Sequence, residues 1–347
     1  MTAPERRAYE LSGGVKDAVA LDDRAIGQRV EGRWYACRLP PGALKNLVRR
    51  SDRAGLANFA PWMVLLIGSG VGAFFAWGSW WAVPTFFGYG TLYTSSDAHW
   101  HECSHGTAFR SRWLNEAFYH LLSFICLREA YLWRWSHARH HMETMMVGRD
   151  PDTVPRPANL PAIATDFLYL YSGSVELKKI LLHAAGIMTP GARQFVPETQ
   201  RRRMIWSSRA YVALMLAIIG GAVALGSFLP LMYVALPRFY DAWFHQLCVL
   251  TQHAGLAEMV KDHRLNTRTV YMNRLCRFLY VNMNYHVEHH MFPMVPFHAL
   301  PRLHELVRDQ MPPAYEGFRA AYREILPTLI RQARDPDYYI RRPLPVG

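Results

Sequence analysis

Two long stretches of the chain contain no charged residue. The first covers the 43 positions from 54 to 96. As one α-helix it would extend about 65 Å, at about 1.5 Å per residue, which is enough to cross a bilayer core of about 30 Å twice. The second covers residues 210–237 and continues, after Arg238 and Asp241, through residues 242–256. Each stretch therefore predicts a pair of membrane-spanning helices, four in total.

The turns within these two pairs are predicted where the apolar pattern breaks. Gly78 or Pro84 interrupts the first stretch, and residues 237–241 interrupt the second. The alternative is that both stretches form the buried core of a soluble protein. We favour the membrane because 43 successive uncharged positions exceed the length of an ordinary core helix.

Polar and amphipathic segments surround the apolar stretches. Residues 1–53 are predicted to be a cytosolic N-terminal segment, in which ALKNLVRR forms a short interfacial helix. The N-terminal MTAPERRAYELSGG lacks the apolar core of a cleaved signal peptide. Residues 54–310 are predicted to be the membrane domain, and residues 311–347 a cytosolic C-terminal helix and tail.

Hydrophobic positions three and four residues apart predict further helices. We expect them at residues 115–135, 167–187, 275–284, 300–311 and 315–333. The predicted fold class is therefore all-α, with two membrane hairpins and a cytosolic helical cap.

The net charge of +12 comes mainly from arginine, and its placement is informative. Basic residues precede the first hairpin, precede the second and follow it: Arg38, Lys45, Arg49, Arg50 and Arg53; Arg201, Arg202, Arg203 and Arg209; and Lys261, Arg264 and Arg268. Because positive residues favour the cytoplasmic side, all three segments are predicted to be cytoplasmic in a multi-pass protein of the inner or cell membrane. The charge is scattered and not gathered into one stripe, so no nucleic-acid partner is expected.

The five cysteines indicate neither a disulfide framework nor a redox dithiol. Their number is odd, and no two of them have CxxC spacing. This usage is typical of a reducing environment such as the cytoplasmic face.

Nine of the sixteen histidines fall into four short clusters. They are His101 and His105 in HECSH, His137, His140 and His141 in HARHH, His253 in TQHAG, and His286, His289 and His290 in HVEHH. Residues three or four apart share one face of a helix, so HxxxH and HxxHH can each present two or three imidazoles to a metal ion. Two hairpins with short outer turns bring all four clusters to the cytoplasmic face. The sequence therefore predicts a site for two metal ions held by nitrogen.

The ligand type narrows the choice of metal. Neutral imidazole suits iron, copper, zinc and nickel, whereas a site without thiolate argues against structural zinc and iron–sulfur clusters. A zinc protease is one alternative, because HECSH formally matches HExxH with Glu102 as general base. That reading leaves the other three clusters unexplained. Iron is favoured because it can activate oxygen.

Three segments together resemble the integral-membrane fatty acid desaturase superfamily, the histidine-box di-iron proteins. HECSHGTAF is similar to the first box, HARHHMETMMVGRDPD to the second with its trailing HHxxT and DPD, and NYHVEHHMFPMVPFHALPRLH to the third. The similarity extends over roughly residues 61–306, and the motifs are specific in combination. The resemblance implies a four-helix membrane domain with a cytosolic cap and a pair of irons held by the box histidines.

The resemblance also implies which side chains bind the irons. The implied ligands are His101, His105, His137, His140, His141, His286, His289 and His290, with His253 as the extra histidine between the second and third boxes. Asp150, Asp152 and Asn282 are candidates for fixing the imidazole tautomers through hydrogen bonds to the ligands. The remaining seven histidines match no box, and we expect them to be structural or exposed.

The implied activity is an oxygen-dependent oxidation of a hydrophobic substrate. Desaturation of a fatty acyl or lipid chain is the first expectation, with two iron ions as cofactor and O₂ as co-substrate. Hydroxylation of a hydrocarbon-like or small amphiphilic molecule is the alternative on the same fold, and a non-catalytic metal sensor or store is a third. No haem, flavin or CxxC motif is recognised, so electrons are expected from a separate protein such as a ferredoxin and its reductase.

Overall fold

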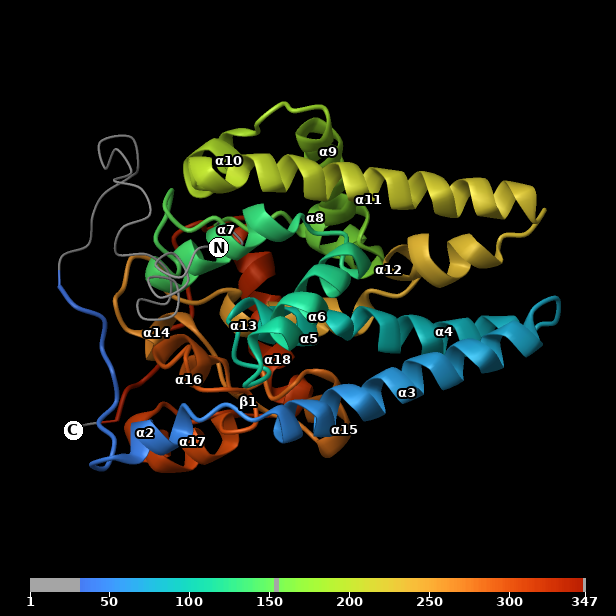
Figure 1. The fold of residues 1–347 in the computed structure, drawn as a ribbon. Helices are drawn as coiled ribbons and strands as arrows, with labels where there is room; N and C mark the ends of the chain where they lie inside the picture. The colour runs from blue at the N-terminus through green and yellow to red at the C-terminus, as the bar shows by residue number, and fades with distance from the viewer. Residues whose placement is uncertain (1–31, 153–155, 346–347) are drawn as a thin grey trace.

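The fold is helical throughout, as predicted. The computed structural model describes residues 32–152 and 156–345. Within these ranges the strands are limited to β1 (Val270–Tyr271) and β2 (Tyr315–Glu316), which pair in parallel. Figure 1 shows a helical body from which two hairpins project in the same direction. The N-terminal residues for which the sequence predicts no signal peptide lie outside the described residues.

The first hairpin forms where the charge-free pattern predicts it. It consists of α3 (Asp52–Ala76) and α4 (Ala82–Thr94), joined at Gly78, whose φ of +83° favours glycine. Ser51 begins α3 by accepting a hydrogen bond from the Ala54 amide at 3.2 Å. Of the two predicted turn positions, Gly78 is therefore confirmed.

The second hairpin differs from the prediction. Its outgoing helix, α11 (Glu198–Ala224), turns near Gly226 (φ +55°), and the chain returns through η3 (Leu231–Ala235) and α12 (Pro237–Tyr240). The turn expected at residues 237–241 is wrong, because this proline-containing segment is part of the returning limb. α13 (Trp243–His253), expected as a fourth spanning helix, belongs to the body.

Among the described residues, two helices, α3 and α11, are long and apolar enough to cross a membrane by length and composition. The returning limbs are shorter: α4 has 13 residues, and the second limb is interrupted before α12. Four continuous spanning helices are therefore not confirmed. Pro237 explains the interruption, because proline has no amide to donate and clashes with the preceding turn.

Tyrosine hydroxyls satisfy carbonyl groups that the interrupted limb exposes. Tyr89 donates to the Tyr233 carbonyl at 2.8 Å, and Tyr93 donates to the Val234 carbonyl at 2.8 Å. In the opposite direction, Tyr233 donates to the Gly70 carbonyl in α3 at 2.7 Å. Irregular backbone is tolerated in an apolar setting only when its polar groups find partners of this kind. The same bonds tie the two hairpins together.

The helix expected at residues 115–135 is divided into two. α6 (Arg112–Ile125) ends before Leu127, which has a φ of +52°, and α7 (Ala130–Met142) begins after Glu129. The Glu129 carboxylate accepts a hydrogen bond from the Leu132 amide at 2.6 Å, so it caps a new helix. Because of this break, the direction of α7, which carries HARHH, is not fixed by the direction of α6.

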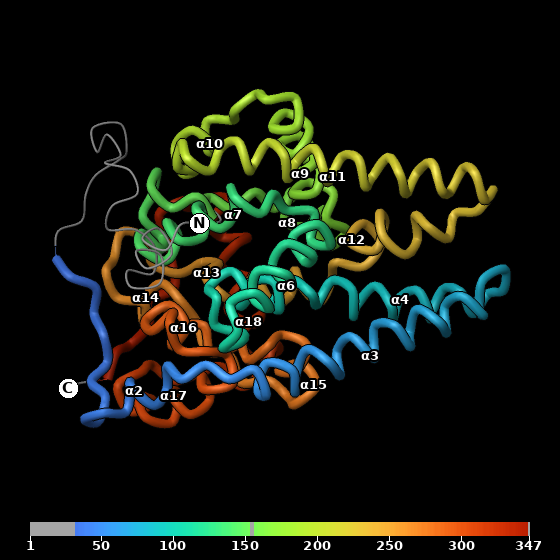
Figure 2. Tube along the Cα trace, viewed as in Figure 1, coloured from blue at the N-terminus to red at the C-terminus, as the bar shows by residue number. Residues whose placement is uncertain are grey.

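Further helices form the body. They are α2 (Ala43–Leu47), α5 (Ser96–Ser104), α8 (Leu160–Thr165), η2 (Asp166–Leu168), α9 (Leu170–Ala184), α10 (Pro190–Phe195), α14 (His263–Asn266), α15 (Arg274–Leu279), α16 (His286–Met291), α17 (Leu300–Val307), η4 (Arg308–Gln310) and α18 (Gly317–Gln332). Helices α9, α15, α17 and α18 confirm the remaining amphipathic predictions. Figure 2 shows the blue α2 beside the red α17, and Leu47 shares a buried cluster with Leu300 and Leu303. The domain boundaries at residues 53 and 310 stay predictions.

Gly90 provides a test of how the second hairpin packs on the first. A Cβ atom at Gly90 would lie 2.6 Å from both Asp241 Cβ and a Tyr240 ring carbon, whereas at Gly88 it would meet nothing within 4 Å. Gly90→Ala should therefore lower the unfolding free energy by about 1–3 kcal/mol, the usual effect of overpacking. Thermal unfolding in detergent measures this, with Gly88→Ala on the same helix as the control. Equal melting temperatures for the two variants would contradict the close approach of α4 and α12.

Candidate metal centre

Four helices from distant parts of the chain bring the nine predicted histidines together. α5 supplies His101, with His105 at its end, α7 supplies the HARHH histidines, α13 ends at His253 and α16 supplies the HVEHH histidines. All nine side chains are buried. In Figure 1 these helices meet in the body, beyond the inner ends of the hairpins.

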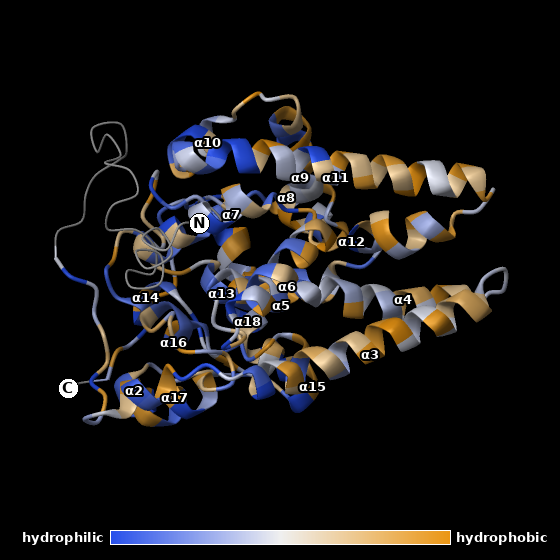
Figure 3. Ribbon diagram, viewed as in Figure 1, coloured by the Kyte–Doolittle hydropathy of each residue, from blue (hydrophilic) through white to orange (hydrophobic). Residues whose placement is uncertain are grey.

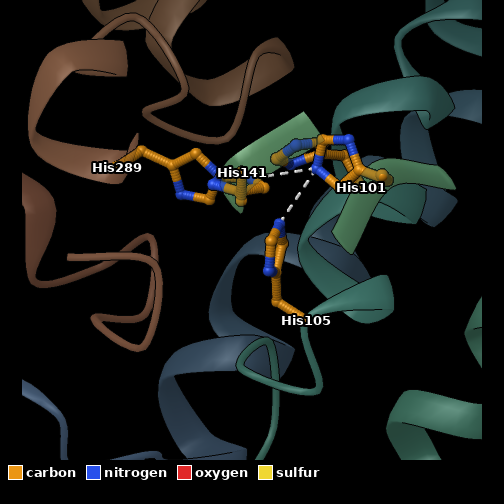
Figure 4. Close-up of side chains that lie close together, drawn as sticks. His101, His105, His141 and His289 are labelled. Atoms are coloured by element: carbon orange, nitrogen blue, oxygen red, sulfur yellow. Dashed lines mark hydrogen bonds between the residues drawn. The ribbon is translucent and has the colours of Figure 1, made fainter. Parts of the chain in front are cut away.

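Five of the histidines form a first cluster. One nitrogen from each of them lies within 4.8 Å of the others: His101, His105, His137, His141 and His289. His137 Nε2 is 3.1 Å from His105 Nε2 and 3.1 Å from His141 Nε2. Figure 4 shows the rings of His101, His105, His141 and His289 directed toward one another. We refer to these five residues as the five-histidine cluster.

The other four form a second cluster beside the first. Nitrogens of His140, His253 and His290 lie within 4.8 Å of one another, and His286 Nε2 is 3.1 Å from His290 Nε2. We refer to these four residues as the four-histidine cluster. The rings of His141 and His290 stack between the clusters, with centroids 4.3 Å apart.

The adjacent histidines of each HH pair belong to different clusters. His140 and His290 contribute to the four-histidine cluster, and their neighbours His141 and His289 contribute to the five-histidine cluster. Successive residues of a helix point about 100° apart, so one HH pair can reach two ions at once. This arrangement gives HxxHH a physical meaning, because the i, i+4 pair faces one cluster and the middle histidine faces the other.

Oxygen atoms behind the rings fix several tautomers. His140 Nδ1 is 2.9 Å from Asp150, and His137 Nδ1 is 3.3 Å from Asp152. His253 Nδ1 donates to the Asn266 carbonyl at 2.9 Å. Because Nδ1 carries the proton in these rings, Nε2 presents its lone pair to the cluster.

Thr144 and Asn282 differ in how they relate to the clusters. Thr144 donates its hydroxyl proton to the His140 carbonyl at 2.7 Å, so its oxygen accepts from His290 Nδ1 at 3.1 Å. Asn282, predicted to hold a ligand tautomer, instead contacts Arg277 Nε and the Phe297 carbonyl. Its φ of +53° places it in the turn before α16. Thr144 was recognisable from the HHxxT spacing, whereas the Asn266 carbonyl has no sequence signal.

The arrangement fits metal ions. Two ligands about 2.1 Å from an ion and at a right angle are about 3.0 Å apart, close to the Nε2 separations of 3.1 Å in both clusters. Buried nitrogens of His101, His289 and His253 have no hydrogen-bond partner within the described residues. Such atoms cost about 1–3 kcal/mol each when unsatisfied, and a metal ion would remove that cost.

Burial keeps most of these rings neutral, which metal ligation requires. It lowers the pKa of His101 to about 3. It also lowers the pKa values well below the ordinary range for His105, His137, His141, His253, His286, His289 and His290. At His140, burial also acts to lower the pKa, but the charge and hydrogen bond of Asp150 outweigh it and raise the pKa.

Glu102 does not behave as the base of a zinc protease. Its carboxylate accepts a hydrogen bond from the Phe297 amide at 3.0 Å, while His101 and His105 join three histidines from other helices. The HExxH pattern in HECSH is therefore part of a larger histidine site. Glu288 is likewise engaged behind α16, where it accepts from Thr269 Oγ1 at 2.6 Å and contacts His304 Nδ1.

The match to a known family agrees with this geometry. The family described as fatty acid desaturase matches residues 79–322, which is more than half of the chain. This chain belongs to the fatty acid desaturase family. The match contains all nine clustered histidines and both returning limbs of the hairpins.

Curated members of the fatty acid desaturase family are similar at low identity. A protein named probable fatty acid desaturase DES1 from Sorghum bicolor is 25% identical over 68% of this chain and 65% of its own length. The chloroplastic omega-3 fatty acid desaturase of Ricinus communis is 23% identical over 76% and 62%. The endoplasmic reticulum omega-3 fatty acid desaturase of Nicotiana tabacum is 23% identical over 64% of both chains. The matched region thus spans less than two thirds of these relatives.

Substitutions in single clusters test the two-ion arrangement. His289→Ala removes a nitrogen from the five-histidine cluster and His253→Ala removes one from the four-histidine cluster, so each should lower bound metal and the double variant should lower it further. Metal content is measured by plasma mass spectrometry after purification. His120→Ala is the control, because this histidine is 40% exposed beside Glu116. Full metal content in either cluster variant would remove that residue from the site.

Proposed function

We propose that this protein is an oxygen-dependent di-iron oxidoreductase that desaturates a fatty acyl or lipid chain. The observation that carries the proposal is the convergence of nine buried imidazoles into two adjacent clusters, in a chain of the fatty acid desaturase family. Neither cluster, as found among the described residues, includes a thiolate or a carboxylate. A donor set made of imidazoles suits a redox-active metal such as iron better than it suits structural zinc.

Bound iron would supply what no side chain can, the activation of O₂ and the removal of hydrogen from an unactivated carbon. The residues of the chain would hold the ions and orient their ligands. The five-histidine cluster and the four-histidine cluster would each bind one ion, and Asp150 and Asp152 keep the Nε2 lone pairs directed inward. Trp133 stacks on His137, with centroids 4.2 Å apart, and helps to keep water from the site.

The hairpins supply the route from the bilayer. Their outer surfaces expose large apolar side chains, including Phe75 at 81% and Val223 at 76%. Others are Val64, Leu65, Ile67, Val71, Phe74, Trp80, Trp81, Val83, Leu214, Leu216, Ile219, Leu225 and Phe228. Figure 3 shows these parts of the hairpins in orange, beyond the bluer body. An apolar surface of this extent is typical of a lipid-facing segment.

We propose that both limbs of each hairpin cross the membrane and that the body lies in the cytoplasm. Arg201, Arg202 and Arg203 lie in the first turns of α11, at the end near the body. This placement agrees with the positive-inside rule. A lipid chain entering between the hairpins would then meet the clusters at the cytoplasmic border.

Hydroxylation remains the second candidate, because the same ligand set serves both outcomes. Removal of a second hydrogen gives an alkene, whereas return of an oxygen atom gives an alcohol. Both reactions need electrons, which we assign to a separate one-electron carrier such as a ferredoxin with its reductase. Lipid and metabolite profiling of cells with and without the protein identifies the substrate.

Product analysis decides between the two reactions. The iron-loaded protein, supplied with membrane lipids, O₂ and a reductase system, should consume O₂ and give products lighter than the substrate by two hydrogen atoms. A product heavier by one oxygen atom would establish the hydroxylase instead. High-resolution mass spectrometry makes this measurement, with the double variant His289→Ala, His253→Ala as the control. Metal binding without O₂ consumption would indicate a metal store.

Cysteine labelling tests the membrane arrangement. Ser79→Cys and Leu225→Cys place exposed thiols at the two hairpin tips, and Glu305→Cys places one on α17 in the body. A membrane-impermeant maleimide should label the tips from outside intact cells, and should label position 305 only after permeabilisation. The unsubstituted protein is the control, since four of its cysteines are buried and Cys276 is partly buried. Labelling of position 305 in intact cells would place the body outside the cytoplasm and contradict the proposed topology.

A further inference from the structure

An N-terminal segment lies over the four-histidine cluster. Residues 32–38 run along the end of the body that faces away from the hairpin tips, drawn in blue in Figures 1 and 2. The Tyr35 amide donates to the Lys261 carbonyl at 2.9 Å, and Lys261 Nζ donates to the Gly32 carbonyl at 2.8 Å. Trp34 Nε1 donates to the Met142 carbonyl, at the end of α7, at 3.0 Å. The segment is thus fastened to the end of α7, which carries HARHH, and to the loop before α14.

Trp34 lies on a short column of rings that leads to a predicted ligand. Its ring stacks on His263, with centroids 4.2 Å apart and planes 6° from parallel. The His263 ring is in turn 5.2 Å from the ring of His290. Trp34 is partly exposed, whereas His263 is 3% exposed and His290 is 3% exposed. Only the His263 ring therefore lies between the surface tryptophan and the four-histidine cluster.

His263 has no other assigned role. It matches no histidine box, and its Nδ1 has no hydrogen-bond partner among the described residues. Its near-parallel stacking on Trp34 gives van der Waals contact between the surface tryptophan and a buried ring. Electron tunnelling weakens steeply across gaps and less steeply through atoms in contact, so such a column is an efficient path.

The surroundings of Trp34 are basic. Arg33 is exposed next to it, and Lys261 and Arg264 are on the segment that carries His263. The Arg264 guanidinium lies 3.5 Å from the centre of the Tyr35 ring and is paired with Asp262 at 2.7 Å. Because Arg264 is buried and paired, Arg33 and Lys261 carry the positive charge near the surface. Positive charge around a partly exposed aromatic residue favours an acidic protein partner and speeds its association.

We infer that Trp34 and His263 form the site where a small acidic one-electron carrier protein docks and passes its electrons inward. This inference rests on the proposed function and adds to it the surface and the path. Two reduced carriers would each give up one electron and leave oxidised, and a bound metal pair would gain the two electrons. The rings of Trp34 and His263 provide electronic contact, and neither ring is oxidised or reduced once the transfer is complete.

Reduction kinetics test the tryptophan. The full-length, iron-loaded protein is mixed without O₂ with a reduced plant-type [2Fe–2S] ferredoxin, whose reoxidation is followed by stopped-flow absorbance. Trp34→Leu should slow reduction about tenfold, the scale expected on loss of a central interface aromatic. Trp34→Phe should keep most of the rate because it keeps a ring. Trp113→Leu, at an exposed tryptophan on α6, is the control and should match the wild type.

Dithionite separates docking from damage to the metal site. It is small enough to reduce the centre without a docking surface, so Trp34→Leu should accept electrons from dithionite at the wild-type rate and keep its full iron content. Equal slowing with both reductants would overturn the inference, because Trp34 would then only support the metal site. A wild-type rate with ferredoxin in Trp34→Leu would overturn it as well.

Substitutions at His263 and in the basic surroundings complete the test. His263→Phe should retain both iron and ferredoxin-driven reduction, and His263→Leu should retain iron but lose rapid reduction by ferredoxin. Loss of iron in His263→Phe would make His263 a ligand and overturn its role as a path. Arg33→Glu should slow association and weaken its dependence on salt. If the wild type bound iron but dithionite did not reduce it, the proposed function itself would fail.

Discussion

The structure depends on keeping nine imidazoles, most of them neutral, close together and away from water. Each ring loses hydration when it is buried, and several nitrogens of the nine rings have no hydrogen-bond partner among the described residues. The body compensates from outside, through Asp150, Asp152, Thr144 and the Asn266 carbonyl, which face the rear nitrogens of the rings. Packing alone would not hold this cluster, because an orphaned polar atom in the interior is costly.

The hairpins are determined partly by local sequence and partly by contacts between distant residues. Charge-free stretches predicted both hairpins, and Gly78 marked the first turn because a positive φ favours glycine. The second turn was misplaced, since Pro237 and the charges near it resemble a loop. In the structure that irregular limb persists because tyrosines from α4 satisfy its carbonyls. Such long-range partners leave no local pattern in a sequence.

The site was more predictable than the elements that carry it. Helical spacing indicated which histidines share a face, and the HH pairs imply two directions from one helix. The break before α7 was missed, because Leu127 is neither glycine nor proline although it adopts a positive φ. Asn282 is predicted to hydrogen-bond a ligand histidine from its place near the third box, yet its side chain contacts Arg277 and Phe297. Proximity in sequence does not determine the direction of a side chain.

Helix α16 has only six residues, yet it contributes to both histidine clusters. A helix this short is not stable alone, and here the Glu288 contacts with Thr269 and His304 hold it from behind. Occupancy of one cluster would therefore immobilise the rings that the other needs. Binding of an ion in one cluster would then favour binding of an ion in the other.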